Sequence, residues 1–233
     1  MLDQKQHRLH LIRILLSCYK NSQVGSWLGF KGGTAAYLFY DLPRFSVDLD
    51  FDLLKKSSDS ERQVLMKKIS SLVEKDYKIK DQYDKKNTLF WFLSYGSGAV
   101  NIKLEISKRQ TQSQFTQQSF YGVQIPVMDR ADMVANKLMA LLERKKFANR
   151  DLFDVWYFLQ SVDFMKINYK LIETRSGLDP EQLWSRILDR INTKAKGNLL
   201  QGMGELISEK QKYWVKTKLI NELLAQIQMR IDI

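Results

Sequence analysis

Two aspartates separated by one residue, Asp48 and Asp50, are the side chains of this sequence best suited to chemistry. If residues 47–53 form a strand, alternate side chains point to opposite faces, so Asp52 shares a face with this pair and the apolar residues between them face a core. Paired carboxylates hold hard cations such as Mg²⁺, and two such ions can clamp the attacking and leaving oxygens of a phosphoryl transfer. The spacing therefore predicts a nucleotide-handling enzyme, although solvated edge strands also carry such pairs.

A pair of glycines precedes these aspartates and suits phosphate binding. Gly32 and Gly33 follow a short apolar strand, Trp27 to Phe30, and lead into a helix-like stretch that opens with Thr34. Glycines at such a turn let the backbone approach a phosphate, and a helix N-terminus supplies N–H donors and a favourable dipole. We expect this backbone to cradle a nucleotide, with the Thr34 hydroxyl as a further donor. A plain tight turn is the alternative.

A third carboxylate is available on a later predicted strand, residues 100–106. Its apolar residues alternate with polar ones, and Glu105 falls on the polar face beside Lys103. A two-metal site needs a further acidic ligand on a neighbouring strand, so Glu105 is the candidate to join Asp48 and Asp50. The competing interpretation is a half-exposed strand with an ordinary Lys–Glu surface pair.

The second half of the chain carries another set of charged residues at helical spacing. Apolar residues recur helically from Asp129 to Glu143, and Lys137 lies within this stretch. After a basic link that begins at Arg144, a second predicted helix carries Asp151 and Asp154, which lie three residues apart and can share a face. A helix-capping Asp151 with a solvated Lys137 would produce the same pattern.

Three segments together resemble the AbiEii/AbiGii-type nucleotidyltransferases. They are Lys-Gly-Gly-Thr-Ala-Ala at 31–36, Arg-x-Ser-x-Asp-Leu-Asp-Phe at 44–51 and Arg-Asp-Leu-Phe-Asp at 150–154. That group contains toxins of bacterial toxin–antitoxin and abortive-infection systems, within the DNA-polymerase-beta-like nucleotidyltransferase superfamily. Thr34 stands where the wider superfamily favours Ser, and the gap to Asp48 is longer, but both departures are usual for the AbiEii-like branch.

The resemblance implies a set of site residues. The implied metal ligands are Asp48, Asp50 and Glu105. The implied nucleotide-binding residues are Gly32, Gly33, Thr34, Arg44 and Ser46. Lys137 and Asp151 belong to the active centre, where a lysine facing the triphosphate would neutralise charge on the leaving pyrophosphate. Whether Asp52, Asp154 or Arg144 take part stays open.

The implied reaction is transfer of a nucleotide from an NTP, with Mg²⁺ or Mn²⁺ as cofactor. The acceptor implied by the resemblance is an RNA 3′ end, in the first place tRNA, and a cognate antitoxin protein is the implied partner. A protein or small-molecule acceptor is the alternative, as is a binding or regulatory module that has lost catalysis.

Composition agrees with a polyanionic partner. The net charge of +11 is spread along all 233 residues, which indicates a folded protein with a basic surface and favours nucleic-acid binding. Cys18 is the one cysteine, which excludes an intramolecular disulfide, and we expect it to pack in the core. His7 and His10 are the only histidines, and we expect them at the surface. Neither a membrane-spanning run nor a signal peptide is predicted, so we expect a cytoplasmic protein.

The periodicities predict an α+β fold with a change of class near Pro126 to Asp129. Residues 1–127 should form a nucleotidyltransferase domain with a leading helix, Gln4 to Asn21, and a mixed β-sheet with helices. Residues 128–233 should form a C-terminal helical bundle with helices that include Pro180 to Ile191 and Tyr213 to Arg230.

Overall fold

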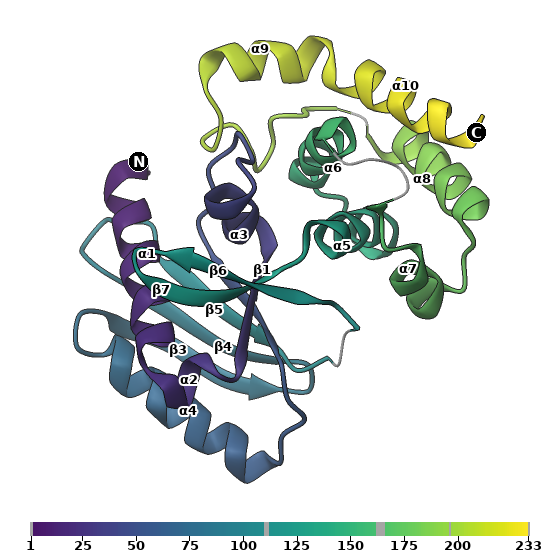
Figure 1. The fold of residues 1–233 in the computed structure, drawn as a ribbon. Helices are drawn as coiled ribbons and strands as arrows, with labels where there is room; N and C mark the ends of the chain where they lie inside the picture. Colours follow the sequence, from purple (N-terminus) through teal and green to yellow (C-terminus); the bar gives the residue numbers. More distant parts are fainter. Residues whose placement is uncertain (1, 110–111, 162–165, 196, 233) are drawn as a thin grey trace. The chain divides into compact units, whose positions relative to one another are not determined.

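A computed structural model describes residues 2–109, 112–161, 166–195 and 197–232 (Figure 1). The chain divides into two compact units. The first comprises Met1–Asp41 and Phe45–Met128, and the second comprises Leu42–Arg44 and Asp129–Ile233. The short segment Leu42–Arg44 therefore groups with the second unit although it lies within the first by sequence.

The first unit is built on a mixed β-sheet with the strand order β3-β4-β5-β2-β1-β7-β6. The strands are β1 Leu28–Lys31, β2 Leu49–Leu53, β3 Lys78–Lys85, β4 Thr88–Ser94, β5 Ile102–Ser107, β6 Phe115–Phe120 and β7 Val123–Met128. Strand β1 runs parallel to β7 and β2 runs parallel to β5, while the other neighbouring pairs are antiparallel. The central strand β2 is thus flanked by β1 and β5, the strands that carry the glycine turn and the third carboxylate.

The helices of the first unit are α1 Gln4–Lys20, α2 Ser22–Gly25, α3 Gly32–Phe39 and α4 Asp59–Val73. Helices α1 and α4 contact each other, and Figure 1 shows them running over the sheet. The Tyr19 ring of α1 lies 6.3 Å from the Phe51 ring of β2, whose neighbour Phe30 is 5.3 Å away. Helix α1 therefore covers the sheet face that carries the apolar residues of β2.

The single cysteine and one histidine lie inside this unit. Cys18 is fully buried on the apolar side of α1, as predicted, and burial raises the pKa of its thiol to about 12. His7 is also fully buried, so the prediction of a surface residue was wrong for it. An imidazole can be buried at low cost when both ring nitrogens find partners, and both do here.

The second unit has helices joined by loops and turns, and no strand among its described residues. Its helices are α5 Arg130–Glu143, α6 Asn149–Ser161, α7 Tyr169–Ser176, α8 Pro180–Lys194, α9 Glu209–Thr217 and α10 Leu219–Ile231. The indole N–H groups of Trp156 and Trp214 each donate to one carboxylate oxygen of Glu222, both at 3.0 Å. Glu222 therefore ties α6, α9 and α10 together. The predicted α+β class, a mixed sheet followed by helices, is confirmed.

One predicted helix is two. The stretch from Tyr213 to Arg230 is divided at Lys218, which is the C-cap residue of α9 and the N-cap residue of α10. The buried residues keep a spacing of four across the break, from Val215 to Leu219 and on to Leu223. Periodicity alone therefore gave no sign of it, and no glycine or proline marks the place.

Within the residues that the structure describes, no helix is both long enough and apolar enough to cross a membrane.

In the first unit, two consecutive hydrogen bonds link the side chains of Trp91, Ser70 and Gln82. The buried Trp91 indole N–H donates to the Ser70 hydroxyl at 3.0 Å, and that hydroxyl donates to Gln82 at 2.8 Å. We predict that Ser70→Ala lowers the free energy of unfolding by about 1–3 kcal/mol, because it strands a buried donor. Urea denaturation measures this, with the exposed Ser71→Ala of the same helix as control. Equal stability of the two variants would contradict the prediction.

Candidate active site

Strand register places three charged residues in one row across the sheet. Lys31 of β1 is the partner of Asp50 in β2, and Asp50 is the partner of Glu105 in β5. Register partners on adjacent strands point their side chains to the same face and lie about 5 Å apart. The structure therefore brings Asp50 and Glu105 together, as the alternation in the sequence predicted.

Asp48 lies just outside the strand. Strand β2 begins at Leu49, two residues later than the predicted start at residue 47. The reason is local: the Asp48 carbonyl accepts a hydrogen bond from the Thr34 hydroxyl. The Asp48 carboxylate reaches β5, where Oδ1 accepts the Lys103 backbone N–H at 3.2 Å and Oδ2 lies 3.7 Å from the Lys103 ammonium. Asp48 is thus fixed beside the same two strands as Asp50 and Glu105.

Negative charge accumulates at this place. The pKa of Glu105 is raised by burial and further by the neighbouring Asp50 and Asp48 carboxylates, against the opposing effect of Lys103 and Lys31. Burial is the largest cause of this rise, and the two neighbouring carboxylates add to it, so three acidic groups lie close together in a partly desolvated place.

The donors fit a divalent cation of the Mg²⁺ type. Such ions take oxygen ligands, and they bind through one or two carboxylates with the remaining positions left to substrate phosphates and water. In the described part of the chain, no three His, Cys, Asp or Glu side chains are grouped so that they could together hold a metal ion. The arrangement is therefore an open set of oxygen donors with excess negative charge rather than a closed protein cage.

Gly32 brings the backbone of the glycine turn against Asp50. Its φ is +79°, in the region that favours glycine, and a Cβ at this position would lie 2.3 Å from Asp50 Oδ2. Helix α3 begins at Gly32, and its N-cap residue Lys31 makes no side-chain capping bond. The backbone N–H groups at this helix start, which include that of Gly33, are suited to an anion.

Thr34 and Ser46, two residues of the first unit that were predicted to bind the nucleotide, are buried. Thr34 is fully buried and its hydroxyl donates to the Asp48 carbonyl, so it helps to hold the backbone at Asp48. Ser46 is 9% exposed. Direct contact of either residue with a nucleotide stays a prediction.

Lys31 is a site residue that the sequence reasoning missed. Its ammonium pairs with Asp52, which is 2% exposed, and it lies in the same row as Asp50 and Glu105. The ion pair answers the open question on Asp52, whose charge is taken up by Lys31. A lysine directly before two glycines was the available signal.

The second unit gathers its charges around Asp154. Arg44 donates to it through two nitrogens, at 2.5 and 2.7 Å, and the Lys137 ammonium lies 2.6 Å from Oδ2. Burial alone would raise the pKa of this fully buried carboxyl, but Arg44 and Lys137 hold it well below its usual range. Arg44, predicted to bind the nucleotide, is 4% exposed, and its guanidinium is paired with Asp154. Its contact with a nucleotide stays a prediction.

Asp151 lies in the first turn of α6 and is 1% exposed. Its Oδ2 is 2.9 Å from Arg144 and its Oδ1 is 3.9 Å from Lys137, yet neither oxygen has a hydrogen bond of good geometry. Asp151 thus does not cap its helix, and the Lys137 side chain, 12% exposed, is not solvated. Lys137, Asp151 and Asp154 form a largely buried charge cluster, which the exposed Arg144 joins through its contact with Asp151.

The comparison with known families decides the identity. The family model described as nucleotidyl transferase AbiEii toxin, type IV TA system, matches residues 13–214. The chain belongs to this family. The resemblance read from the glycine turn and the aspartate pair is confirmed, and this AbiEii-family protein is an NTP-dependent nucleotidyltransferase.

Solved structures share its fold. A candidate nucleotidyltransferase from Helicobacter pylori superposes with a TM-score of 0.63 at 21% identity, covering 100% of this chain and 96% of that one. The protein JHP933 from Helicobacter pylori gives 0.59 at 22% identity, covering 100% of this chain and 94% of that one. No curated protein matches this AbiEii-family chain at a significant level.

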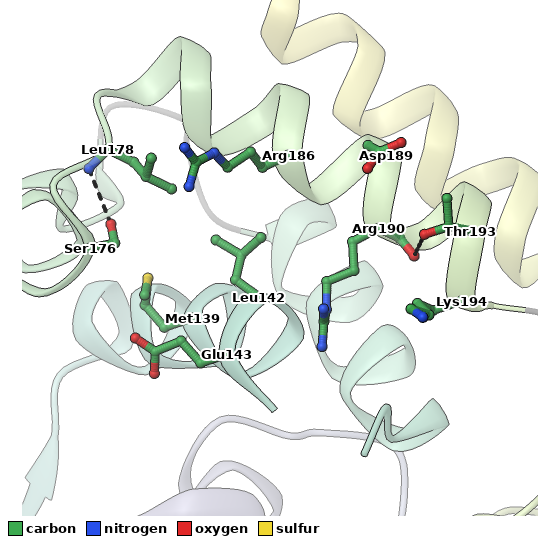
Figure 2. A pocket seen from close by; sticks show the side chains of 10 residues that line it. All are labelled: Met139, Leu142, Glu143, Ser176, Leu178, Arg186, Asp189, Arg190, Thr193 and Lys194. Atoms are coloured by element: carbon green, nitrogen blue, oxygen red, sulfur yellow. Dashed lines mark hydrogen bonds between the residues drawn. The ribbon is translucent and has the colours of Figure 1, made fainter. Parts of the chain in front are cut away.

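A pocket of about 530 Å³ lies in the second unit of this AbiEii-family enzyme (Figure 2). Helix α8 contributes Arg186, Arg190 and Lys194, one turn apart, and α5 contributes Met139 and Leu142. Figure 2 shows the α8 side chains facing those of α5. Its mixed lining of cations, carboxylates and apolar groups sets it apart from the carboxylate site of the first unit.

We predict that Gly32→Ala abolishes most nucleotidyl transfer, by about 100-fold or more, because a Cβ would push Asp50 from its position and small displacements at an active centre have effects of this size. Gly98→Ala is the matched control. Gly98 has a similar φ of +73° but nothing within 4 Å of its would-be Cβ. Both variants should lose about 1–2 kcal/mol of stability from the left-handed backbone. Comparable activity of the Gly32→Ala and Gly98→Ala variants would contradict the close approach of Gly32 to Asp50.

For the second unit, we predict that Asp154→Asn lowers the free energy of unfolding by about 3–5 kcal/mol at pH 7, since it removes the buried negative charge that Arg44 and Lys137 both contact. The exposed Asp189→Asn should have little effect. Because the folded-state pKa of Asp154 is lowered, its contribution is present above the unfolded value of about 4 and is lost as pH falls through the folded pKa. Chemical denaturation from pH 7 to pH 3 measures both; a constant difference over this range would refute the assignment.

Proposed function

We propose that this enzyme transfers a nucleoside monophosphate from an NTP to an RNA 3′ end, with tRNA as the first candidate acceptor, and that it requires Mg²⁺ or Mn²⁺. The observation that carries the proposal is the row formed by Asp50 and Glu105 with Asp48 beside it. The raised pKa of Glu105 supports it, because this excess negative charge suits a divalent cation.

The glycine turn would receive the triphosphate. Gly32, Gly33 and Thr34 begin helix α3, where backbone N–H groups and the helix dipole favour an anion. Gly32 is also in contact distance of Asp50, so a phosphate bound at this turn would lie next to the carboxylates that hold the cation. Nucleotide and cation would therefore share one site on the first unit.

The chemical step is a displacement at the α-phosphorus. The acceptor hydroxyl oxygen forms a bond to that phosphorus, the bond to the bridging oxygen breaks, and pyrophosphate leaves with its electron pair. Glu105 takes the hydroxyl proton, a task suited to a carboxylate of raised pKa. The chemistry supplied by the bound cation is Lewis-acid stabilisation of charge on the phosphoryl oxygens.

Lys137 and Asp151 would orient the nucleotide, as the family resemblance implies. Asp151 supports this role because its buried oxygens have charged neighbours but lack well-formed hydrogen bonds, which leaves acceptor capacity in the cluster. Lys137 is held at 2.6 Å from Asp154, so its ammonium is fixed in position. In this proposal Arg44 and Asp154 set the geometry of the cluster.

An RNA acceptor is supported by charge. The net charge of +11 favours a polyanion, and α8 adds Arg186, Arg190 and Lys194 along one face of the second unit. As a member of a type IV toxin family, the enzyme would act within a toxin–antitoxin system, with a cognate antitoxin as its genetic partner. Modification of an RNA 3′ end would then arrest translation, and the site of action would be the cytoplasm.

The test is incubation with each labelled NTP, Mg²⁺ and total bacterial tRNA. We expect label on RNA from one preferred NTP, with Asp48→Asn and Asp50→Asn each reducing it by at least about 100-fold. Asp81→Asn, an exposed aspartate on β3 of the same sheet, should retain activity. EDTA should stop the reaction and Mn²⁺ or Mg²⁺ should restore it.

The same experiment distinguishes an RNA acceptor from a protein or small-molecule acceptor. Binding of RNA should weaken steeply with salt because phosphate contacts release counterions. Label on protein or on a small molecule, with weak salt dependence, would replace the RNA proposal by the alternative acceptor. Activity unaffected by EDTA, or by both aspartate substitutions, would overturn the metal-dependent mechanism.

A further inference from the structure

The buried His7 connects helix α1 to the strand that carries the aspartates. Its Nε2 lies 2.9 Å from the carbonyl oxygen of Val47, and its Nδ1 lies 2.9 Å from the Tyr95 hydroxyl. A carbonyl oxygen only accepts, so Nε2 carries the proton and donates to Val47. Nδ1 then accepts from the Tyr95 hydroxyl. Both ring nitrogens of His7 therefore have a partner within the protein.

Val47 is the residue directly before Asp48. The backbone around Asp48 therefore receives two side-chain hydrogen bonds in succession, from His7 at the Val47 carbonyl and from Thr34 at the Asp48 carbonyl. The Asp48 carboxylate receives a third from the Lys103 backbone N–H. This segment is not in the sheet ladder, because β2 begins only at Leu49. Side chains must therefore supply the restraint that strand pairing gives to Asp50.

We propose that His7 is a positioning residue for the reaction, which fixes Asp48 through the Val47 carbonyl. The inference rests on the proposed metal-dependent transfer and names the group that prepares one of its ligands. It predicts that a residue on the first helix, 41 positions away from Asp48 in sequence, controls the affinity of the carboxylates for a divalent cation. Partners that orient metal ligands typically change metal affinity or activity by about 10–100-fold when they are removed.

Tyr95 forms the outer part of this arrangement. It follows β4, its hydroxyl holds Nδ1 of His7, and its ring stacks on His10 at 4.1 Å. Because the Tyr95 hydroxyl contacts the imidazole of His7, its effect on the aspartate would pass through that ring. Its removal should have a smaller effect than removal of His7.

The test compares Mn²⁺ binding to the full-length protein, followed by electron paramagnetic resonance, for the wild type, His7→Leu and His7→Gln. Leucine keeps the bulk and removes the donor, whereas the glutamine amide can donate to the Val47 carbonyl. We expect His7→Leu to weaken Mn²⁺ binding by about 10-fold or more and His7→Gln to restore most of it. Transfer assays should show lower kcat and a higher Mg²⁺ requirement, with the KM for RNA unchanged.

Two controls separate positioning from loss of folding. His10→Leu removes the neighbouring imidazole of the same helix, which stacks on Tyr95 and lies 3.2 Å from the Tyr77 hydroxyl, and it should bind Mn²⁺ like the wild type. Melting temperatures show whether the variants are folded. Wild-type Mn²⁺ affinity in a folded His7→Leu protein would overturn the inference, whereas no Mn²⁺ binding by the wild type would instead overturn the proposed function.

Discussion

Mutual repulsion among carboxylates on adjacent strands is the constraint on which this structure depends. Asp50 and Glu105 are register partners and Asp48 reaches the same strand as Glu105. The pKa of Glu105 is raised by burial first and by these two carboxylates in addition. A fold that gathers such charges loses stability unless cations balance them. Lys31 and Lys103 provide part of that balance. The remaining excess is what gives the enzyme its proposed affinity for a divalent cation and a triphosphate.

The sheet provides the rigidity for this arrangement, and local contacts provide the fine placement. Strand pairing fixes Asp50 and Glu105, while Asp48, outside the ladder, is held by side chains from α1 and α3. In the second unit, the buried carboxylate of Asp154 is paired directly with two cations. There Arg44 and Lys137 neutralise Asp154 almost completely, so that cluster stabilises the unit and fixes Lys137 beside Asp151.

Patterns of alternation and helical spacing predicted the fold class and the juxtaposition of Asp50 with Glu105, because strand residues two apart must share a face. The sequence did not reveal which charged residues pair with each other. The family resemblance placed Arg44 at the nucleotide, but nothing in the sequence indicated that its guanidinium pairs with Asp154, 110 residues away. His7 and Lys31 were missed or misplaced for the same reason: burial and ion pairing depend on tertiary contacts. The break at Lys218 left no trace in the apolar spacing.

Anomalous diffraction at the manganese edge, from crystals grown with Mn²⁺, tests the central claim most directly. The account predicts a peak among the Asp48, Asp50 and Glu105 oxygens, at about 2.1 Å from at least two of them. The same peak should be absent from crystals of the Asp50→Asn variant. A manganese peak elsewhere in the molecule, with these carboxylates bound only to lysine and water, would contradict it.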